Sequence, residues 1–257
     1  MDDIKQILKK SGINDYRFEA AQILSLPESM REQAVNRRLA GEPLQYILGE
    51  WEFYSLPFKV GPGVLIPRPE TELLVDLALE FLKPGENVID MCSGSGAIAV
   101  ALSKNAGLRV DALEKYPAAL DYLRQNVASN NADVNIIEGD IFSFVPDKKY
   151  SLILSNPPYI KTGDMASLQK EVQFEPCEAL DGGDDGLVFY RRIAQFTEFL
   201  SEHGGIAVEC GFNEADDIAE IFSAHGLEIN ILRDLSGVQR VVFGTLGPCN
   251  IDLNVIK

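Results

Sequence analysis

Cysteine and histidine are scarce in this chain of 257 residues. It holds four cysteines and two histidines, and no two cysteines form a CxxC pair. They are Cys92, Cys177, Cys210, Cys249, His203 and His225. Structural zinc sites and disulfide frameworks need closely spaced cysteines or histidines. The sequence therefore predicts a protein without structural metal that works in a reducing, cytoplasmic compartment.

Long hydrophobic runs are also missing. No stretch reaches the roughly 18 apolar residues that mark a membrane-spanning helix. The N-terminus, Met1-Asp2-Asp3-Ile4-Lys5, lacks the basic start and apolar core of a secretory signal. The apolar share of 46% is that of an ordinary globular protein. We therefore expect a globular protein with no membrane partner.

Positive charge is in deficit, and the deficit is uneven. The net charge is −16. Residues 1–75 hold 9 basic and 11 acidic residues, whereas the remainder holds 14 and 28. Such an acidic domain repels phosphate backbones, which disfavours direct binding to nucleic acid. The charge suits a basic protein partner, although it could equally serve solubility alone.

Three segments differ in their patterns, and they predict three domains or linkers. Residues 1–48 show helical apolar spacing, with a stop at Gly41 and Pro43, and predict a small helical domain. Residues 49–72 begin with β-prone aromatics and a Gly61-Pro62-Gly63 turn, which predict a linking β-hairpin. Residues 73–257 alternate strand and helix patterns and predict the catalytic domain.

This alternation predicts a doubly wound, mainly parallel α/β sheet of seven strands, covered by helices on both faces. The last two strands are joined by only five residues, which permits an antiparallel hairpin and no helical crossover. The expected strands are residues 88–90, 109–113, 134–137, 152–155, 205–209, 228–234 and 240–244. The expected helices are residues 71–82, 97–105, 118–130, 187–200 and 214–224.

The run Asn156-Pro157-Pro158-Tyr159 follows the apolar segment 150–155, and hence ends a buried strand. Open α/β sheets bind their ligands at this carboxyl edge. Two prolines fix the backbone and remove two N–H donors, so the loop offers free carbonyls, an amide and a ring. That combination suits the holding of a flat NH2 group, although Asn-Pro also marks ordinary turns.

A glycine turn follows the first strand of the expected sheet. Gly94 and Gly96 allow the backbone to approach a ligand closely. Glu114 lies 20 residues after Gly94, where an acid can accept hydrogen bonds from a ribose diol. The turn also fits the dinucleotide fingerprint, so a nicotinamide dehydrogenase is one candidate.

Two observations favour S-adenosylmethionine over a dinucleotide. Asp90, just before the turn, suits a cationic amino-acid group better than a pyrophosphate, and no hydride-transfer acid is evident. Asp140 and Ile141 follow the third strand, where they can meet the adenine amino group and ring. Asp90 and Asp140 also have simpler readings, as a helix N-terminal charge and a turn residue.

Taken together, these motifs resemble the protein-(glutamine-N5) methyltransferases that act on bacterial release factors, over nearly the whole chain. The matching segments are residues 37–49 (RRLAGEPLQYILG), 51–54 (WEFY), 65–72 (LIPRPETE), 156–160 (NPPYI), 174–176, 179–187, 209–211 and Arg240. NPPY alone is shared with DNA adenine methyltransferases, whereas its combination with PRPETE and the helical N-terminus is highly specific.

The resemblance implies transfer of a methyl group from S-adenosylmethionine to the glutamine of the GGQ loop in peptide-chain release factors, giving S-adenosylhomocysteine. The implied catalytic residues are Asn156, Pro157 and Tyr159. The implied substrate-binding residues are Asn156, Pro157, Pro158, Tyr159, Arg68 and Glu70. The implied cofactor-binding residues are Asp90, Cys92, Ser93, Gly94, Ser95, Gly96, Glu114, Asp140, Ile141 and Asn156. We expect Arg68 and Glu70 to brace the pocket rather than to react.

Three positions depart from the family pattern. Cys92 replaces a glycine of the cofactor turn, so its side chain either crowds the cofactor or shows that the backbone there has a negative φ. Glu114 replaces the usual Asp, and Asn213 stands where Gln is common. None of these changes removes a group that the chemistry needs.

Three other functions stay open at this point. A glutamine methyltransferase of a ribosomal protein would use the same catalytic motifs. A DNA adenine-N6 methyltransferase would need a basic DNA-binding surface and base flipping, which the acidic catalytic domain disfavours. A non-enzymatic protein that only binds S-adenosylmethionine would follow if Cys92 impaired the pocket.

Overall fold

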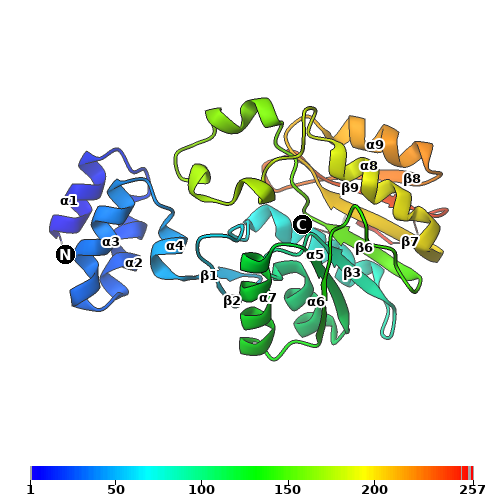
Figure 1. Cartoon of the computed structure of the whole chain (residues 1–257), viewed down its shortest axis with the longest axis horizontal. Helices are drawn as coiled ribbons and strands as arrows, with labels where there is room; N and C mark the ends of the chain where they lie inside the picture. Colours follow the sequence, from blue (N-terminus) through cyan, green and yellow to red (C-terminus); the bar gives the residue numbers. More distant parts are fainter. Residues whose placement is uncertain (1, 250, 254–255, 257) are drawn as a thin grey trace.

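The computed structural model describes residues 2–249, 251–253 and 256. A helical domain and a larger α/β domain lie side by side, joined by a two-stranded hairpin (Figure 1). The helical domain comprises α1 (Asp2–Lys10), α2 (Tyr16–Ser25), α3 (Glu28–Leu39) and α4 (Leu44–Leu48). Its helices bury a small core formed by Leu8, Ala20, Ile23, Ala34, Val35, Leu44 and Ile47. Helical spacing of apolar residues thus gives each helix one buried face.

The hairpin consists of β1 (Glu50–Phe53) and β2 (Leu56–Lys59). Its chain reversal lies at Tyr54 and Ser55, both with positive φ (51° and 58°), and not at Gly61-Pro62-Gly63. A two-residue reversal with positive φ matches the twist of the strands, which the aromatic and serine side chains did not reveal in the sequence. Tyr54 also donates its hydroxyl to Asp76 (2.7 Å), which fastens the hairpin to the α/β domain.

The α/β domain is built on a seven-stranded sheet of order β5-β4-β3-β6-β7-β9-β8. The strands are β3 (Val88–Met91), β4 (Val110–Glu114), β5 (Val134–Glu138), β6 (Tyr150–Ser155), β7 (Leu200–Glu209), β8 (Glu228–Arg233) and β9 (Gln239–Thr245). Strands β3 to β7 run parallel, and β9 is antiparallel to both neighbours. The doubly wound fold and the antiparallel end of the sheet are confirmed.

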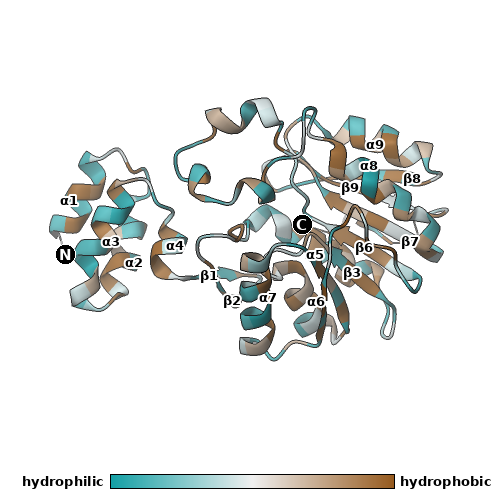
Figure 2. Ribbon diagram, viewed as in Figure 1, coloured by the Kyte–Doolittle hydropathy of each residue, from teal (hydrophilic) through white to brown (hydrophobic). Residues whose placement is uncertain are grey.

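Helices cover both faces of this sheet. The helices are α5 (Glu72–Phe81), α6 (Ala97–Ala106), α7 (Pro117–Ser129), α8 (Val188–Ala194) and α9 (Ala215–Ala224). Val88 packs with α5 and α6, whereas its neighbour Ile89 packs with α8 and α9. Successive strand side chains point to opposite faces, so a strand covered on both faces is mainly apolar. Figure 2 accordingly shows hydrophobic colour along the central strands.

The segment between β6 and α8 is long and irregular. It contains 3-10 turns at Thr162–Ser167, Val172–Phe174 and Cys177–Ala179, and in Figure 1 it reaches from the sheet toward the N-terminal helices. Glu171 in this segment pairs with Arg38 of α3 (3.0 Å). The expected helix 187–200 is only partly correct, because α8 ends at Ala194, continues as a 3-10 helix to Phe199 and is followed by β7, which begins at Leu200 instead of residue 205.

Candidate active site

A cavity of 220 Å³ opens at the carboxyl ends of β3, β4 and β6. Its wall includes these residues of the expected site: Arg68, Cys92, Ser93, Gly94, Ser95, Glu114, Asp140, Ile141, Asn156 and Pro158. Parallel strands bring their C-terminal loops to one edge, so motifs distant in sequence meet there. Asp90, Gly96, Pro157, Tyr159 and Glu70 do not line the cavity.

The glycine turn is tightly folded beneath the cavity. Gly96 has φ of 81°, and a Cβ there would lie 2.4 Å from Leu123 of α7, so only glycine fits. Cys92 has φ of 60°, which excludes a negative φ, the second of the two alternatives that the sequence left open. The next residue, Ser93, donates its N–H to the carbonyl oxygen of Leu113 in β4 (3.0 Å), and this bond joins the turn to the neighbouring strand. Cys92 therefore carries backbone strain that a glycine would avoid.

Asp90 lies fully buried behind this turn. Its Oδ2 accepts a hydrogen bond from Ser93 Oγ (2.6 Å), whereas Oδ1 has no partner among the described residues. Burial raises the pKa of Asp90 to about 7. A buried carboxylate oxygen without a partner is costly, and this cost is the reason that burial raises the pKa.

Glu114 is oriented by three backbone donors. Gly94 N donates to its Oε2 (2.8 Å), and the N–H groups of Lys115 and Tyr116 donate to its Oε1 (2.8 and 2.9 Å). A carboxylate has about four acceptor positions, so one remains for a group in the cavity. Glu114 thus joins the glycine turn of β3 to the end of β4.

The side of the cavity away from the turn is apolar and aromatic. Ile141 is buried, and Phe142 and Phe189 pack at 5.2 Å between ring centroids in the cavity wall. Asp140 instead accepts from Phe142 N (3.0 Å) and pairs with Lys115 (2.9 Å), which together lower its pKa. The two phenylalanines were missed in the sequence, because isolated aromatics after a strand and inside a helix carry no motif.

The Asn156 loop forms the opposite wall. Asn156 Nδ2 donates to Thr71 Oγ1 (3.1 Å) of the 3-10 helix Pro69–Thr71. Pro157 and Pro158 are buried. Tyr159 packs so closely that a Cβ on Gly182 would lie 2.7 Å from its Cα, and burial raises the pKa of its hydroxyl. The loop is therefore held rigidly by its surroundings.

Arg68 links this wall to the long segment after β6. It forms an ion pair with Glu175, which is buried and also accepts from Ile66 N (3.0 Å). Glu70 is exposed at the start of the same 3-10 helix. Arg68 thus braces the cavity wall, and Glu70 lies outside it.

No group of three or more His, Cys, Asp or Glu side chains within the described residues could hold a metal ion. None of the helices in the described part of the chain is long and apolar enough to cross a membrane.

The fold and the cavity define a methyltransferase. The family model described as methyltransferase small domain matches residues 69–199. A solved methyltransferase from Pyrococcus furiosus has the same fold, with a TM-score of 0.59 and 18% identity, over 86% of this chain and 100% of that one.

Proteins of similar sequence identify the family within the methyltransferases. The chain is 42% identical to the release factor glutamine methyltransferase of Thermodesulfovibrio yellowstonii, over 94% of this chain and 96% of that protein. It is 43% identical to the release factor glutamine methyltransferase of Geobacter sulfurreducens, over 83% and 76%. The chain belongs to the release factor glutamine methyltransferase family. This membership sets aside the dehydrogenase, the DNA adenine methyltransferase and the non-enzymatic binding protein.

Proposed function

We propose that this protein transfers a methyl group from S-adenosylmethionine to the side-chain amide nitrogen of the GGQ glutamine in peptide-chain release factors. The observation that carries the proposal is Asn156, a rigidly held amide in the wall of a cavity whose floor is a glycine turn. The named relatives support the same substrate.

The cavity suits S-adenosylmethionine. Glu114 in the cavity wall suits the ribose diol, and the ionised form of Asp90, behind the glycine turn, would attract the cofactor's ammonium group through its charge. Ile141 with the two phenylalanines offers an apolar surface for adenine. When bound, the cofactor supplies a methyl group on an electrophilic sulfonium.

Asn156 and Pro157 orient the substrate amide in this proposal. The Asn156 Oδ1 and the Pro157 carbonyl oxygen accept hydrogen bonds from the two amide hydrogens, which leaves the nitrogen's weak lone pair facing the methyl group. With the cofactor bound, Asn156 and Pro157 would hold the nitrogen for in-line transfer of the methyl group from sulfur, and the nitrogen would lose one proton to solvent after transfer, when the site opens. Orientation of this kind lowers a barrier by up to roughly 7–11 kcal/mol in favourable cases, and the two carbonyl dipoles favour the charge that develops on nitrogen.

Tyr159 and the N-terminal helices have supporting roles. The Tyr159 ring packs beside the amide and excludes water. Helices α1 to α3 grip the body of the release factor, and the acidic surface attracts basic regions of that partner. Binding at a distance from the cavity explains how one glutamine is selected among many.

Deletion of residues 1–41 tests this division. It removes α1 to α3 but keeps Tyr46, whose hydroxyl bonds to Val64 O (2.5 Å) in the α/β domain. We expect KM for an intact release factor to rise more than about tenfold, as loss of a binding surface does, whereas KM for a GGQ peptide stays within a factor of about two. Equal effects on both substrates would refute a gripping role, and cofactor affinity serves as the folding control.

Mass spectrometry of an unmethylated release factor, incubated with the protein and S-adenosylmethionine, tests the function itself. We expect a gain of one methyl group on the GGQ glutamine, and none when this glutamine is replaced by alanine. No gain with a protein that binds the cofactor would refute the proposal, and a gain on a ribosomal protein would reassign the substrate.

A further inference from the structure

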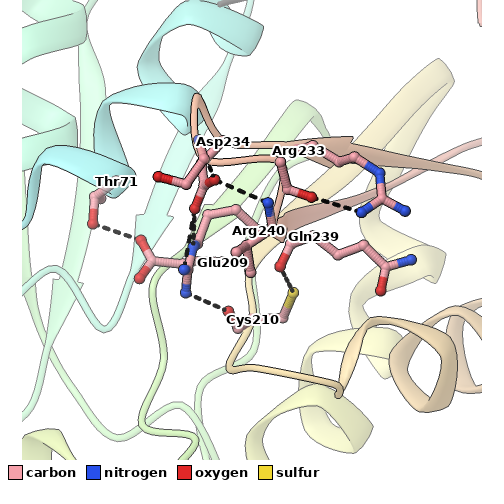
Figure 3. A network of polar contacts seen from close by, with 10 residues as sticks. Thr71, Glu209, Cys210, Arg233, Asp234, Gln239 and Arg240 are labelled. Atoms are coloured by element: carbon pink, nitrogen blue, oxygen red, sulfur yellow. Dashed lines mark hydrogen bonds and ion pairs between the residues drawn. The ribbon is translucent and has the colours of Figure 1, made fainter.

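A chain of two hydrogen bonds lies behind Asn156. Asn156 Nδ2 donates to Thr71 Oγ1 (3.1 Å), and Thr71 Oγ1 donates to Glu209 Oε2 (2.5 Å). Figure 3 shows the second bond, between the 3-10 helix before α5 and the end of β7. Thr71 is 4% exposed and Glu209 is 2% exposed, so water does not compete for these groups.

The direction of this chain follows from the proton inventory of its members. An ionised carboxylate only accepts, and a hydroxyl has a single proton. Because Thr71 gives that proton to Glu209, its oxygen can only accept from Asn156. The Asn156 side chain must therefore turn its NH2 toward Thr71 and its Oδ1 away from it.

We propose that Thr71 and Glu209 are positioning residues that fix the amide orientation of Asn156, so that its carbonyl oxygen and not its NH2 group faces the substrate amide. This inference rests on the proposed function, in which that oxygen accepts from the glutamine NH2. With the amide reversed, two NH2 groups would face each other and the glutamine would lose an acceptor.

Burial raises the pKa of Glu209 to about 7, even though the Thr71 hydrogen bond and the guanidinium groups of Arg240 and Arg68 favour the ionised form, and Glu70 adds to the rise. Glu209 is therefore the ionised acceptor that the chain needs above about pH 7, so the chain is tested at pH 8. Arg240 is held in place by Asp234 (3.2 Å) and by the Cys210 carbonyl oxygen (3.4 Å), as Figure 3 shows. The hydroxyls of Tyr159 and Tyr190 also lie near Glu209 and stay protonated, because burial raises the pKa of each.

The test compares Thr71→Val, which has nearly the same shape but no hydroxyl, with Thr71→Ser, which keeps the hydroxyl. We expect Thr71→Val to lower kcat on a release factor by about 10- to 100-fold, the range of a lost buried hydrogen bond, with unchanged cofactor affinity. Thr71→Ser should stay within about threefold of wild type. Thr245→Val is the matched control, because Thr245 is also buried and bonds through its hydroxyl, but to Gly247 O (2.7 Å) outside the site.

A double-mutant cycle separates positioning from general damage. In an Asn156→Ala background, Thr71→Val should cause no further loss of kcat. The same fold loss in both backgrounds, a loss in Thr71→Ser equal to that in Thr71→Val, or a wild-type kcat in Thr71→Val would each overturn the inference.

The wild-type reaction distinguishes failure of the proposed function from failure of this inference. If wild type does not methylate the release factor, the Asn156 side-chain NH2 signal in a ¹⁵N NMR spectrum, assigned by its loss in Asn156→Ala, decides instead. We expect slow hydrogen exchange of that NH2 in wild type and Thr71→Ser, and fast exchange in Thr71→Val. Equal exchange in all three proteins would overturn the inference.

Discussion

The two walls of the cavity are constructed differently. The cofactor wall is local: the glycine turn and the β4 end are joined by a Gly94–Glu114 bond that spans 20 residues. The amide wall is assembled from distant parts, because the bonds of Thr71 to Asn156 and to Glu209 span 85 and 138 residues. We infer that the cofactor wall controls affinity, whereas the amide wall controls turnover.

Asn156→Ala should produce the largest effect and affect turnover alone. We expect kcat to fall by at least about 100-fold, as loss of a group that stabilises developing charge commonly does. The Kd of S-adenosylmethionine, measured by calorimetry, should change by less than about threefold, because the cofactor wall remains intact. Near-normal turnover of this variant would remove the catalytic role of Asn156 and with it the contrast between the walls.

Glu114→Ala should show the opposite pattern. We expect the Kd of S-adenosylmethionine to rise by about 30- to 100-fold, which corresponds to about 2–3 kcal/mol for lost charge-assisted hydrogen bonds. At saturating cofactor, kcat should return to within a few-fold of wild type. Glu114→Gln keeps the shape and one acceptor and should fall between. A kcat that stays low at saturation would show that Glu114 also orients the reacting groups.

The pH dependence of cofactor binding should be somewhat smaller. Burial raises the pKa of Asp90 to about 7, so its carboxyl is mostly protonated at pH 6 and mostly ionised at pH 8. Only the ionised form attracts a cationic ammonium group, so affinity for S-adenosylmethionine should rise by about tenfold from pH 6 to pH 8 and then level off. Asp90→Asn should flatten this profile. A profile unchanged by that substitution would place the ammonium group elsewhere.

Cys92→Gly should give the smallest effect, on stability. Glycine adopts the φ of 60° at this position without strain, so the free energy of unfolding should rise by up to about 1 kcal/mol. Cys92→Ala retains a Cβ and should give no such gain. The midpoint of denaturant unfolding measures both variants. An equal gain in the two would mean that the thiol, and not the backbone, is the unfavourable element.

Much of the fold was predictable from the sequence. All seven strands of the sheet were expected, because strands covered on both faces are mainly apolar, as the run of residues 152–154 in β6 shows. The antiparallel end followed from a connection too short for a crossover. The hairpin reversal was wrongly placed, because its positive φ values fall on Tyr54 and Ser55 and not on glycine. Tyr54 N donates to Glu72 of α5 (2.7 Å), a contact that the sequence does not show.

The residues of the site likewise include some that the sequence predicted and some that it did not. Residues of the glycine turn and Glu114 were identified because their spacing is set by one strand-turn-helix unit and the next strand. Thr71, Phe142 and Phe189 were not assigned a role, and their contribution depends on how helices and loops pack on the sheet. The backbone conformation at Cys92 was also open, and the contact beside it, from Ser93 N to Leu113 O of a neighbouring strand, does not follow from local sequence.

By itself, the sequence determined the sheet, the cofactor turn and the amide loop, because backbone periodicity and local spacing act over about 20 residues. Only the tertiary structure decided which way the Asn156 amide faces. That orientation depends on a threonine and a glutamate from two other elements, brought together where the strands end. The direction of a hydrogen bond depends on the donors and acceptors of every group in the chain of bonds, and here those groups lie far apart in the sequence.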